Sequence, residues 1–289
     1  MSADRVAKIT ADYVVYDVFT ATAFGGNQLA VFPDARVLPK AKLQAITREF
    51  NFSEVTFVYP PENPAHTARV RIFTPTREVP FAGHPTIGTA IALRDLGRGI
   101  ELILELGVGP IPCHVGPSGA SFTTPVPLEI IARPDVALVA EALGLPATAI
   151  CTDHHGPVQA SLGLAFVLVE LSDRAALAAA QPVLEACRKG AALHPAGLDF
   201  AIFCYVRDGE AVEARMFAPL DNMPEDPATG SASATLGAFL AQLPGGPQRL
   251  AISQGVDMGR PSQIGVTVGP DGVTVTGQAV QTMAGRLFV

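Results

Sequence analysis

The sequence predicts an α/β protein made of two similar halves, each a curved sheet wrapped around one apolar helix. Two observations support this prediction. Residues 71–80 (RIFTPTREVP) and 215–224 (RMFAPLDNMP) share the pattern Arg-x-Phe-x-Pro-x4-Pro, 144 residues apart (215 minus 71). Each block is followed by a glycine, Gly83 or Gly230, and then by an apolar helical pattern. A repeat at about half of the 289-residue length is typical of a duplicated unit.

Both glycine-led segments are predicted to be helices that are buried nearly all round. Their apolar residues recur at helical spacing: Ile87, Ala90 and Ile91 in the first, and Leu236, Phe239, Leu240 and Leu243 in the second. Charges occur only late in the first helix and not in the second. A helix without a polar face belongs in the interior of a protein.

Short β-prone segments, separated by Gly and Pro, account for much of the remaining chain. They are residues 13–21, 27–32, 54–59, 68–73 and 102–106 in the first half, and 164–171, 200–206, 211–217, 263–268 and 272–280 in the second. Residues 41–50 and 172–190 show helical patterns, and we expect them to cover the sheets from outside.

Composition excludes several classes of protein. The chain is 48% hydrophobic and 16% charged, which disfavours disorder, and its net charge of −7 disfavours nucleic-acid and anionic-membrane partners. Neither a signal-peptide pattern nor an apolar run of membrane-spanning length is evident. The four cysteines (Cys113, Cys151, Cys187 and Cys204) form no C-x-x-C pair. They are therefore expected to be reduced thiols in a cytoplasmic protein.

The two helix starts at Gly83 and Gly230 are expected to bind an anion. The first turn of a helix has N–H groups without intrahelical acceptors, and glycine lets a ligand approach the backbone. If the two halves face each other, both helix starts would border one cleft that holds a small carboxylate. The alternative is that each glycine only permits a tight turn.

Four side chains near these helix starts have the chemistry for proton transfer or hydrogen bonding. They are Glu54 in NFSEVTFVY, His84 after the first glycine, Asp226 in EDPATGS and Ser231 after the second glycine. Each has a simpler interpretation. Glu54 could be a solvated strand end, His84 and Ser231 could satisfy backbone groups at a helix start, and Asp226 could form a turn before proline.

Metal and nucleotide cofactors have no local support. Residues 153–156 (DHHG) are expected to form a surface turn, because adjacent histidines in a Gly-Pro turn seldom bind one metal together. No H-x-x-x-H pair, P-loop or G-x-G-x-x-G after a strand is present, and neither is a G-x-S-x-G elbow. A hydrolase that uses Ser231, His84 and Asp226 stays open, because such triads form in space.

Several blocks of the chain resemble a known family. They are residues 17–32, 51–58, 71–90, 215–234 and 253–262, and the most specific are GHPTIGTA and EDPATGSA. These blocks resemble the phenazine biosynthesis-like (PhzF-like) family of isomerases, which is related in fold to diaminopimelate epimerase and proline racemase. The resemblance runs over essentially the whole chain.

This resemblance implies two pseudo-symmetric diaminopimelate epimerase-like domains in a homodimer, with the site in the cleft between the domains and no cofactor. The N-terminal domain would comprise residues 1–115 and 276–289, and the C-terminal domain residues 116–275. The implied activity is that of an isomerase that moves a proton within a small carboxylate substrate. Trans-2,3-dihydro-3-hydroxyanthranilate is one candidate substrate, and a non-catalytic binding homologue is the alternative.

The resemblance also implies roles for individual residues. Glu54 would be the principal acid/base, supported by His84 and Asp226. The substrate would be bound by Asn27, Ser231 and the backbone near Gly83 and Gly230. The racemases of this fold use two cysteines at the helix starts, which are absent here. Gln28 also replaces a proline that is usual in the family after Asn27, so the stiffness of this loop is expected to differ.

Overall fold

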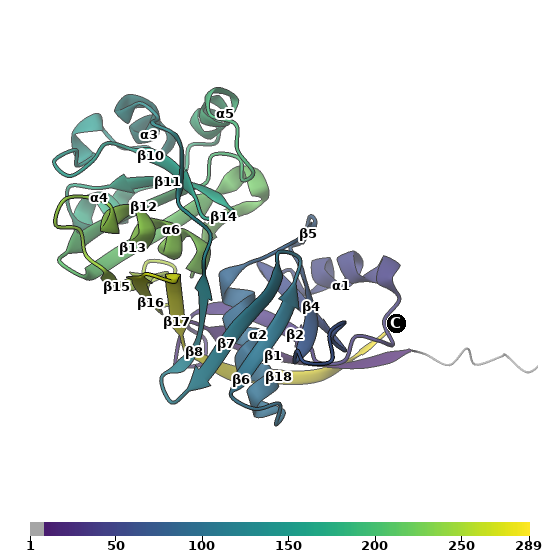
Figure 1. Cartoon of the computed structure of the whole chain (residues 1–289). Helices are drawn as coiled ribbons and strands as arrows, with labels where there is room; N and C mark the ends of the chain where they lie inside the picture. Colours follow the sequence, from purple (N-terminus) through teal and green to yellow (C-terminus); the bar gives the residue numbers. More distant parts are fainter. Residues whose placement is uncertain (1–8) are drawn as a thin grey trace, which may run out of the picture. The chain divides into compact units, whose positions relative to one another are not determined.

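The computed structural model describes residues 9–289, which divide into two compact units (Figure 1). The N-terminal unit contains the described residues up to 24, residues 28–122 and residues 278–289. The C-terminal unit contains residues 25–27 and 123–277. Residues 1–8 lie outside the described residues. The expectation that no signal peptide is present falls partly on them.

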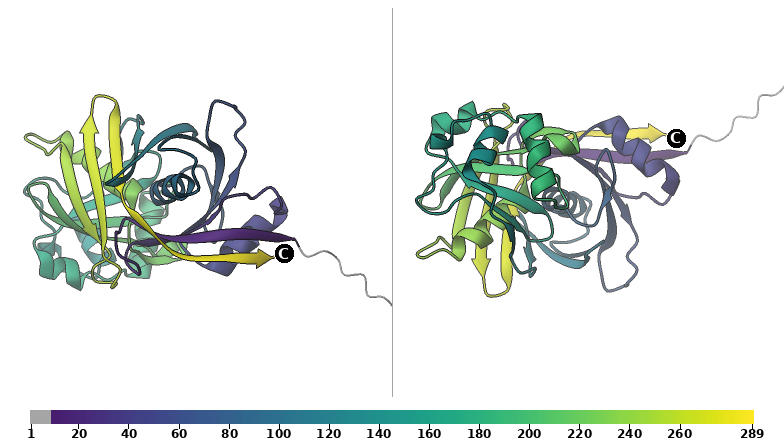
Figure 2. Two further views of the ribbon diagram at one scale, coloured as in Figure 1. Left: turned by 90° about the horizontal axis from the view of Figure 1, so that it is seen from below. Right: turned by 90° about the horizontal axis from the view of Figure 1, so that it is seen from above.

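The N-terminal unit is a curved sheet around helix α2 (Gly83–Asp95), which Figure 2 shows end-on among the strands. Its strands are β1 (Thr10–Val18), β2 (Asn27–Phe32), β3 (Glu54–Tyr59), β4 (Ala68–Phe73), β5 (Glu78–Val79), β6 (Glu101–Leu106), β7 (Gly109–Gly116), β8 (Gly119–Thr124) and β18 (Ala279–Phe288). Residues 83–93 of α2 are all buried, as their lack of charge predicts.

Neighbouring strands of this sheet follow the order β18, β1, β2, β3, β4, β6, β7, β8. The pairs β2–β3 and β4–β6 are parallel, and β3–β4, β6–β7, β7–β8 and β1–β18 are antiparallel. Helix α1 (Leu43–Phe50), preceded by the 3-10 turn η1 (Lys40–Lys42), connects β2 to β3 and packs on β3 and β4.

The C-terminal unit is built in the same way around helix α6 (Gly230–Ala241). Its strands are β9 (Glu129–Ala132), β10 (Val158–Ser161), β11 (Ala165–Glu170), β12 (Ile202–Asp208), β13 (Ala211–Ala218), β14 (Met223–Asp226), β15 (Arg249–Gln254), β16 (Ser262–Gly269) and β17 (Gly272–Gly277). Its other helical segments are α3 (Val136–Ala142), η2 (Ala147–Ala149), α4 (Arg174–Ala179), α5 (Leu184–Leu193) and η3 (Pro219–Asp221).

The two sheets have the same topology. In the C-terminal unit the order is β9, β10, β11, β12, β13, β15, β16, β17. The pairs β11–β12 and β13–β15 are parallel, whereas β12–β13, β15–β16 and β16–β17 are antiparallel, as in the corresponding pairs of the other unit. The internal repeat in the sequence is therefore a repeat of the fold.

The predicted extent of one helix is wrong. Residues 172–190 read as one helical stretch, but the structure breaks them into α4 and α5. Pro182 lies in the break. Proline has no N–H for a helical hydrogen bond and disfavours the helical conformation of the residue before it, which explains the interruption.

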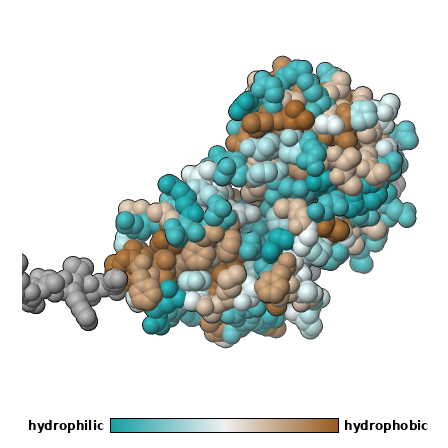
Figure 3. Space-filling view, turned by 180° about the vertical axis from the view of Figure 1, so that it is seen from behind, coloured by the Kyte–Doolittle hydropathy of each residue, from teal (hydrophilic) through white to brown (hydrophobic). Residues whose placement is uncertain are grey.

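Within residues 9–289, no helix combines the length and the apolar character that crossing a membrane would require. The surface in Figure 3 mixes hydrophilic and hydrophobic residues, with hydrophobic residues gathered on the N-terminal unit beside the start of β1. Exposed apolar side chains near the two chain ends include Ile9, Met283 and Phe288.

Candidate functional site

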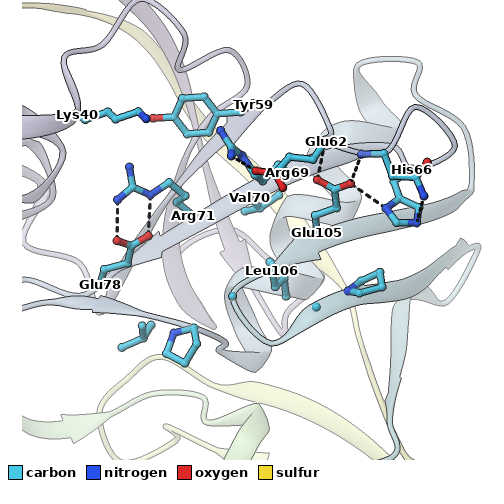
Figure 4. A pocket seen from close by; sticks show the side chains of 16 residues that line it. Lys40, Tyr59, Glu62, His66, Arg69, Val70, Arg71, Glu78, Glu105 and Leu106 are labelled. Atoms are coloured by element: carbon cyan, nitrogen blue, oxygen red, sulfur yellow. Dashed lines mark hydrogen bonds and ion pairs between the residues drawn. The ribbon is translucent and has the colours of Figure 1, made fainter.

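A salt bridge holds the turn that precedes α2. Arg71 of β4 donates two hydrogen bonds to the Glu78 carboxylate of β5, at 2.7 and 2.6 Å (Figure 4). The Arg71 guanidinium also lies 5.0 Å from the centre of the Phe73 ring. This arrangement fixes β5 against β4 and so directs the chain toward the start of α2.

The turn before α6 is built from the equivalent residues. Arg215 of β13 donates two hydrogen bonds of 2.8 Å to Glu225 of β14, and its guanidinium lies 4.8 Å from the Phe217 ring centre. Arg215 is buried and also donates to the carbonyl groups of residues 177, 178 and 180. The repeated Arg-x-Phe motif is thus a frame that positions both buried helices.

Glu54 and His84 meet inside the N-terminal unit. Glu54 is the first residue of β3, and His84 is the second residue of α2. The Nδ1 atom of His84 lies 3.4 Å from Oε2 of Glu54, and the two side chains are only 5% and 13% exposed. Within the part of the chain that the structure describes, Nε2 of His84 has no hydrogen-bond partner.

Burial lowers the pKa of His84 from 6.5 to about 3, although a hydrogen bond with the Gln28 backbone opposes this shift. The imidazole is therefore neutral near pH 7, and its 3.4 Å contact with Glu54 is a polar contact and not an ion pair. A neutral imidazole has one N–H donor and one acceptor nitrogen. It can consequently orient the Glu54 carboxyl group without competing with it for a proton.

The N-termini of both buried helices lack side-chain caps. The N-cap residues are Ala82 for α2 and Thr229 for α6, and neither makes a side-chain capping hydrogen bond. Threonine is a favoured N-cap residue, but the Thr229 hydroxyl donates to Asp226 instead. The first-turn N–H groups of both helices, including those of Gly83 and Gly230, are therefore suited to bind an anion.

In the C-terminal unit, two side chains fix the Asp226 carboxylate. Its Oδ1 accepts a hydrogen bond of 2.8 Å from Asn27 Nδ2, and its Oδ2 accepts one of 2.6 Å from the Thr229 hydroxyl. Gln254 completes the arrangement by donating to the Asp226 carbonyl and the Thr229 hydroxyl, at 2.7 and 3.0 Å. All four residues are buried. Asp226 is thus held in one orientation as part of a network.

The expected site residues accordingly fall into two groups. Glu54, Gly83 and His84 belong to the N-terminal unit, whereas the C-terminal unit contains Asn27, Asp226, Gly230 and Ser231. Ser231 is half-buried in the first turn of α6. Thr229 and Gln254 were missed as functional candidates. Thr229 lies in EDPATGS and Gln254 in SQGVDMGRPS, two blocks that already stood out, but only the fold brings the two residues together.

A separate groove of about 890 Å³ in the N-terminal unit contains none of these site residues. It lies along β4, β5, β6 and β7, and its labelled charged residues are seen in Figure 4. Its arginines and histidine are paired with carboxylates: Arg71 with Glu78, Arg69 with Glu62, and His66 with Glu105. These three pairs bring each of those basic side chains together with a carboxylate inside the groove.

Comparison with known sequences matches this chain to one family and to several similar proteins. The family described as phenazine biosynthesis-like protein matches residues 16–285. An uncharacterized isomerase of Mesorhizobium japonicum is 38% identical over 97% of this chain and 99% of its own length. The trans-2,3-dihydro-3-hydroxyanthranilate isomerase of Pseudomonas chlororaphis is 38% identical over 86% of this chain and 87% of its own length.

Solved structures confirm the fold class. A PhzF-family phenazine biosynthesis protein of Bacillus anthracis superposes with a TM-score of 0.85 at 24% identity, over 97% of this chain and 99% of that chain. A hydroxyproline epimerase of Agrobacterium vitis superposes with a TM-score of 0.61 at 16% identity, over 98% and 94% of the two chains. The fold is therefore shared with epimerases of the proline racemase type.

Proposed function

The chain belongs to the phenazine biosynthesis-like family of isomerases, and we propose that it moves a proton within a small carboxylate substrate without a cofactor. The observation that most supports this chemistry is the buried contact between Glu54 and His84. A carboxyl group held in a protected environment can remove a proton from one carbon and return it to another.

In this proposal Glu54 is the acid/base that shuttles the proton. It would take the proton from a carbon next to an unsaturated or carbonyl-activated group, and then deliver it to a second carbon of the same substrate. Neutral His84 would keep the Glu54 carboxyl group oriented through the 3.4 Å contact. The uncapped N–H groups at the start of α2 would stabilise negative charge that develops during transfer.

We assign substrate binding to residues of the C-terminal unit as well. Asn27 and Ser231, with the N–H groups near Gly230, would bind the substrate and its carboxylate. Asp226, which Asn27 holds in place, would support the proton transfer by Glu54. Assembly as a homodimer, a cytoplasmic location and the domain limits at residues 115/116 and 275/276 stay predictions.

The first substrate to test is trans-2,3-dihydro-3-hydroxyanthranilate, for which the Pseudomonas chlororaphis relative is named. Proton NMR in D2O would follow its conversion by the wild-type chain, Glu54→Gln and the control Glu49→Gln, whose side chain is exposed in α1. We expect Glu54→Gln to lower kcat by about 10²–10⁴-fold, as for other removed acid/base groups, and Glu49→Gln to leave it unchanged.

The outcomes separate the substrate from the mechanism. Wild-type turnover that persists in Glu54→Gln would exclude Glu54 as the shuttle. If neither the wild type nor either variant converts trans-2,3-dihydro-3-hydroxyanthranilate, this compound is excluded as the substrate. The same variants would next be compared for deuterium incorporation into other small unsaturated or amino carboxylates.

A further inference from the structure

Three side chains in the C-terminal unit, unrelated to the proposed proton transfer, form a compact cluster of metal-ligand type. They are Cys151, which follows η2, His154 in the next turn, and Glu170 at the end of β11. One potential donor atom from each lies within 4.8 Å of the other two. We propose that Cys151, His154 and Glu170 form a zinc site.

The distances are close to those that a zinc ion needs. His154 Nδ1 already lies 3.0 Å from Glu170 Oε2. Zinc bonds are about 2.3 Å to sulfur and about 2.0–2.2 Å to nitrogen or oxygen, so the ligands of a tetrahedral ion lie about 3.3–3.7 Å apart. Donor atoms that lie within 4.8 Å of one another would have to shift by about an ångström to surround one ion, and the fourth position is left for water.

The backbone fixes two of the three ligands next to each other. The Cys151 N–H donates to the Glu170 carbonyl at 2.9 Å, and the preceding residue, Ile150, forms a bridge with Leu171. His154 follows Cys151 by only three residues. Cys151 is half-buried and the His154 side chain is 50% exposed, so an ion can reach the cluster from solvent.

The Glu170 carboxylate has its two oxygens in different environments. Glu170 is only 5% exposed. Its Oε1 lies 3.5 Å from Arg207 Nε, whereas its Oε2 faces His154. Among the described residues, Arg207 thus places a positive charge beside Oε1 without a hydrogen bond from its Nε, while Oε2 is the oxygen that faces the cluster.

The adjacent His155 serves a different purpose. Its Nδ1 lies 2.7 Å from the Gly156 carbonyl and its Nε2 lies 2.5 Å from the Tyr205 hydroxyl, so both ring nitrogens are already occupied. His155 is therefore not proposed as a ligand. It is also only 8% exposed, so the expectation that residues 153–156 form a surface turn is wrong for His155. The additional ligands come from Cys151 and from Glu170, which is distant in sequence.

The ligand types favour zinc over harder cations. Thiolate and imidazole are preferred by zinc and neighbouring transition metals, whereas magnesium and calcium prefer oxygen ligands. Binding would replace the Cys151 thiol proton with a zinc–sulfur bond and release that proton to the buffer. The thiolate and the Glu170 carboxylate would balance the two charges of the ion.

The test uses the full chain without an affinity tag and titrates it with Zn²⁺ in a calorimeter. We expect one ion per chain and a heat that varies with the buffer, because a proton is released. Cys151→Ser and His154→Ala should each weaken binding by at least about 100-fold, since even outer partners cost about 10–100-fold. The control is His66→Ala, which removes a similar histidine–glutamate pair at 2.8 Å.

A second measurement detects the metal–sulfur bond directly. Co²⁺ bound to the wild-type chain should show a sulfur-to-cobalt charge-transfer band, and Cys151→Ser should remove it. The proposal is wrong if the wild-type chain binds no Zn²⁺. It is also wrong if the charge-transfer band is missing, or if folded Cys151→Ser binds Zn²⁺ as tightly as the wild type.

Discussion

The buried imidazole of His84 should make the stability of the N-terminal unit depend on pH. The folded-state pKa of His84 is about 3, below the ordinary value of 6.5. Protons therefore bind the unfolded chain more readily at this position, so acid favours unfolding. The contribution of His84 to stability is present above about pH 6.5 and is lost as the pH falls toward 3.

The size of this loss follows from the two pKa values. Each pKa unit corresponds to about 1.36 kcal/mol, and the linkage relation gives almost no loss of stability at pH 7 and a loss of about 2 kcal/mol at pH 5. Other groups also titrate in this range, so the wild-type chain alone cannot isolate the effect. His84→Gln removes this imidazole, and His114→Gln removes the largely exposed imidazole beside Glu101.

Urea unfolding at pH 7 and pH 5 measures the effect, with tyrosine fluorescence as the probe. The chain has four tyrosines and no tryptophan. Three of these tyrosines, Tyr13, Tyr16 and Tyr59, lie in the N-terminal unit. The wild-type chain should lose about 2 kcal/mol more between pH 7 and pH 5 than His84→Gln does. His114→Gln should lose as much as the wild type.

Nitrogen-15 NMR of labelled histidine gives a direct check of the same reasoning. His84 should keep the chemical shifts of a neutral imidazole at pH 5. If instead it titrates near pH 6 or above, the Glu54 carboxylate at 3.4 Å stabilises a charged imidazole. In that case burial is not the dominant effect, and the proposed role of neutral His84 fails with it.

Two matched pairs of substitutions test the frame and the packing. Arg215→Ala should lower the free energy of unfolding by about 3–5 kcal/mol, because it removes a buried guanidinium and leaves the Glu225 carboxylate, which is only 17% exposed, without this partner. Arg71→Ala, at a more exposed pair, should lower it by about 1 kcal/mol. Equal losses in urea unfolding would contradict this assignment. Gly190→Ala would place a Cβ 2.4 Å from the Phe200 ring and should cost about 1–3 kcal/mol. Gly156→Ala meets nothing within 4 Å and should leave the thermal unfolding midpoint unchanged.

The sequence predicted the duplicated architecture because the repeat involves residues with strict geometric roles. Arg71 and Arg215 must reach a carboxylate on the following short strand. The partners Glu78 and Glu225 are 147 residues apart (225 minus 78), as are Gly83 and Gly230. The three additional residues of the second half therefore lie between Arg215 and Glu225. If the two halves are aligned with an offset of 147 residues from that point on, Glu78 is matched with Glu225, and each arginine is matched with its partner.

Other features depend on contacts that no local pattern records. Thr229 reads as an N-cap, but its hydroxyl binds Asp226 because Gln254 comes close from β15. Glu170 reads as the end of an apolar strand, and only the pairing of Ile150 with Leu171 brings it beside Cys151. The polar networks could therefore be recognised only in the folded structure, whereas the two buried helices could be predicted from the sequence.

The position of β18 has a consequence for the order in which the chain can fold. This last strand pairs with β1 along its length, and the Val289 N–H donates to the Ile9 carbonyl (Figures 1 and 2). During synthesis, every residue of the C-terminal unit leaves the ribosome before β18 does. The half of the protein that is made first is thus completed only when β18 has been made. Until then the edge of β1 that pairs with β18 stays unpaired.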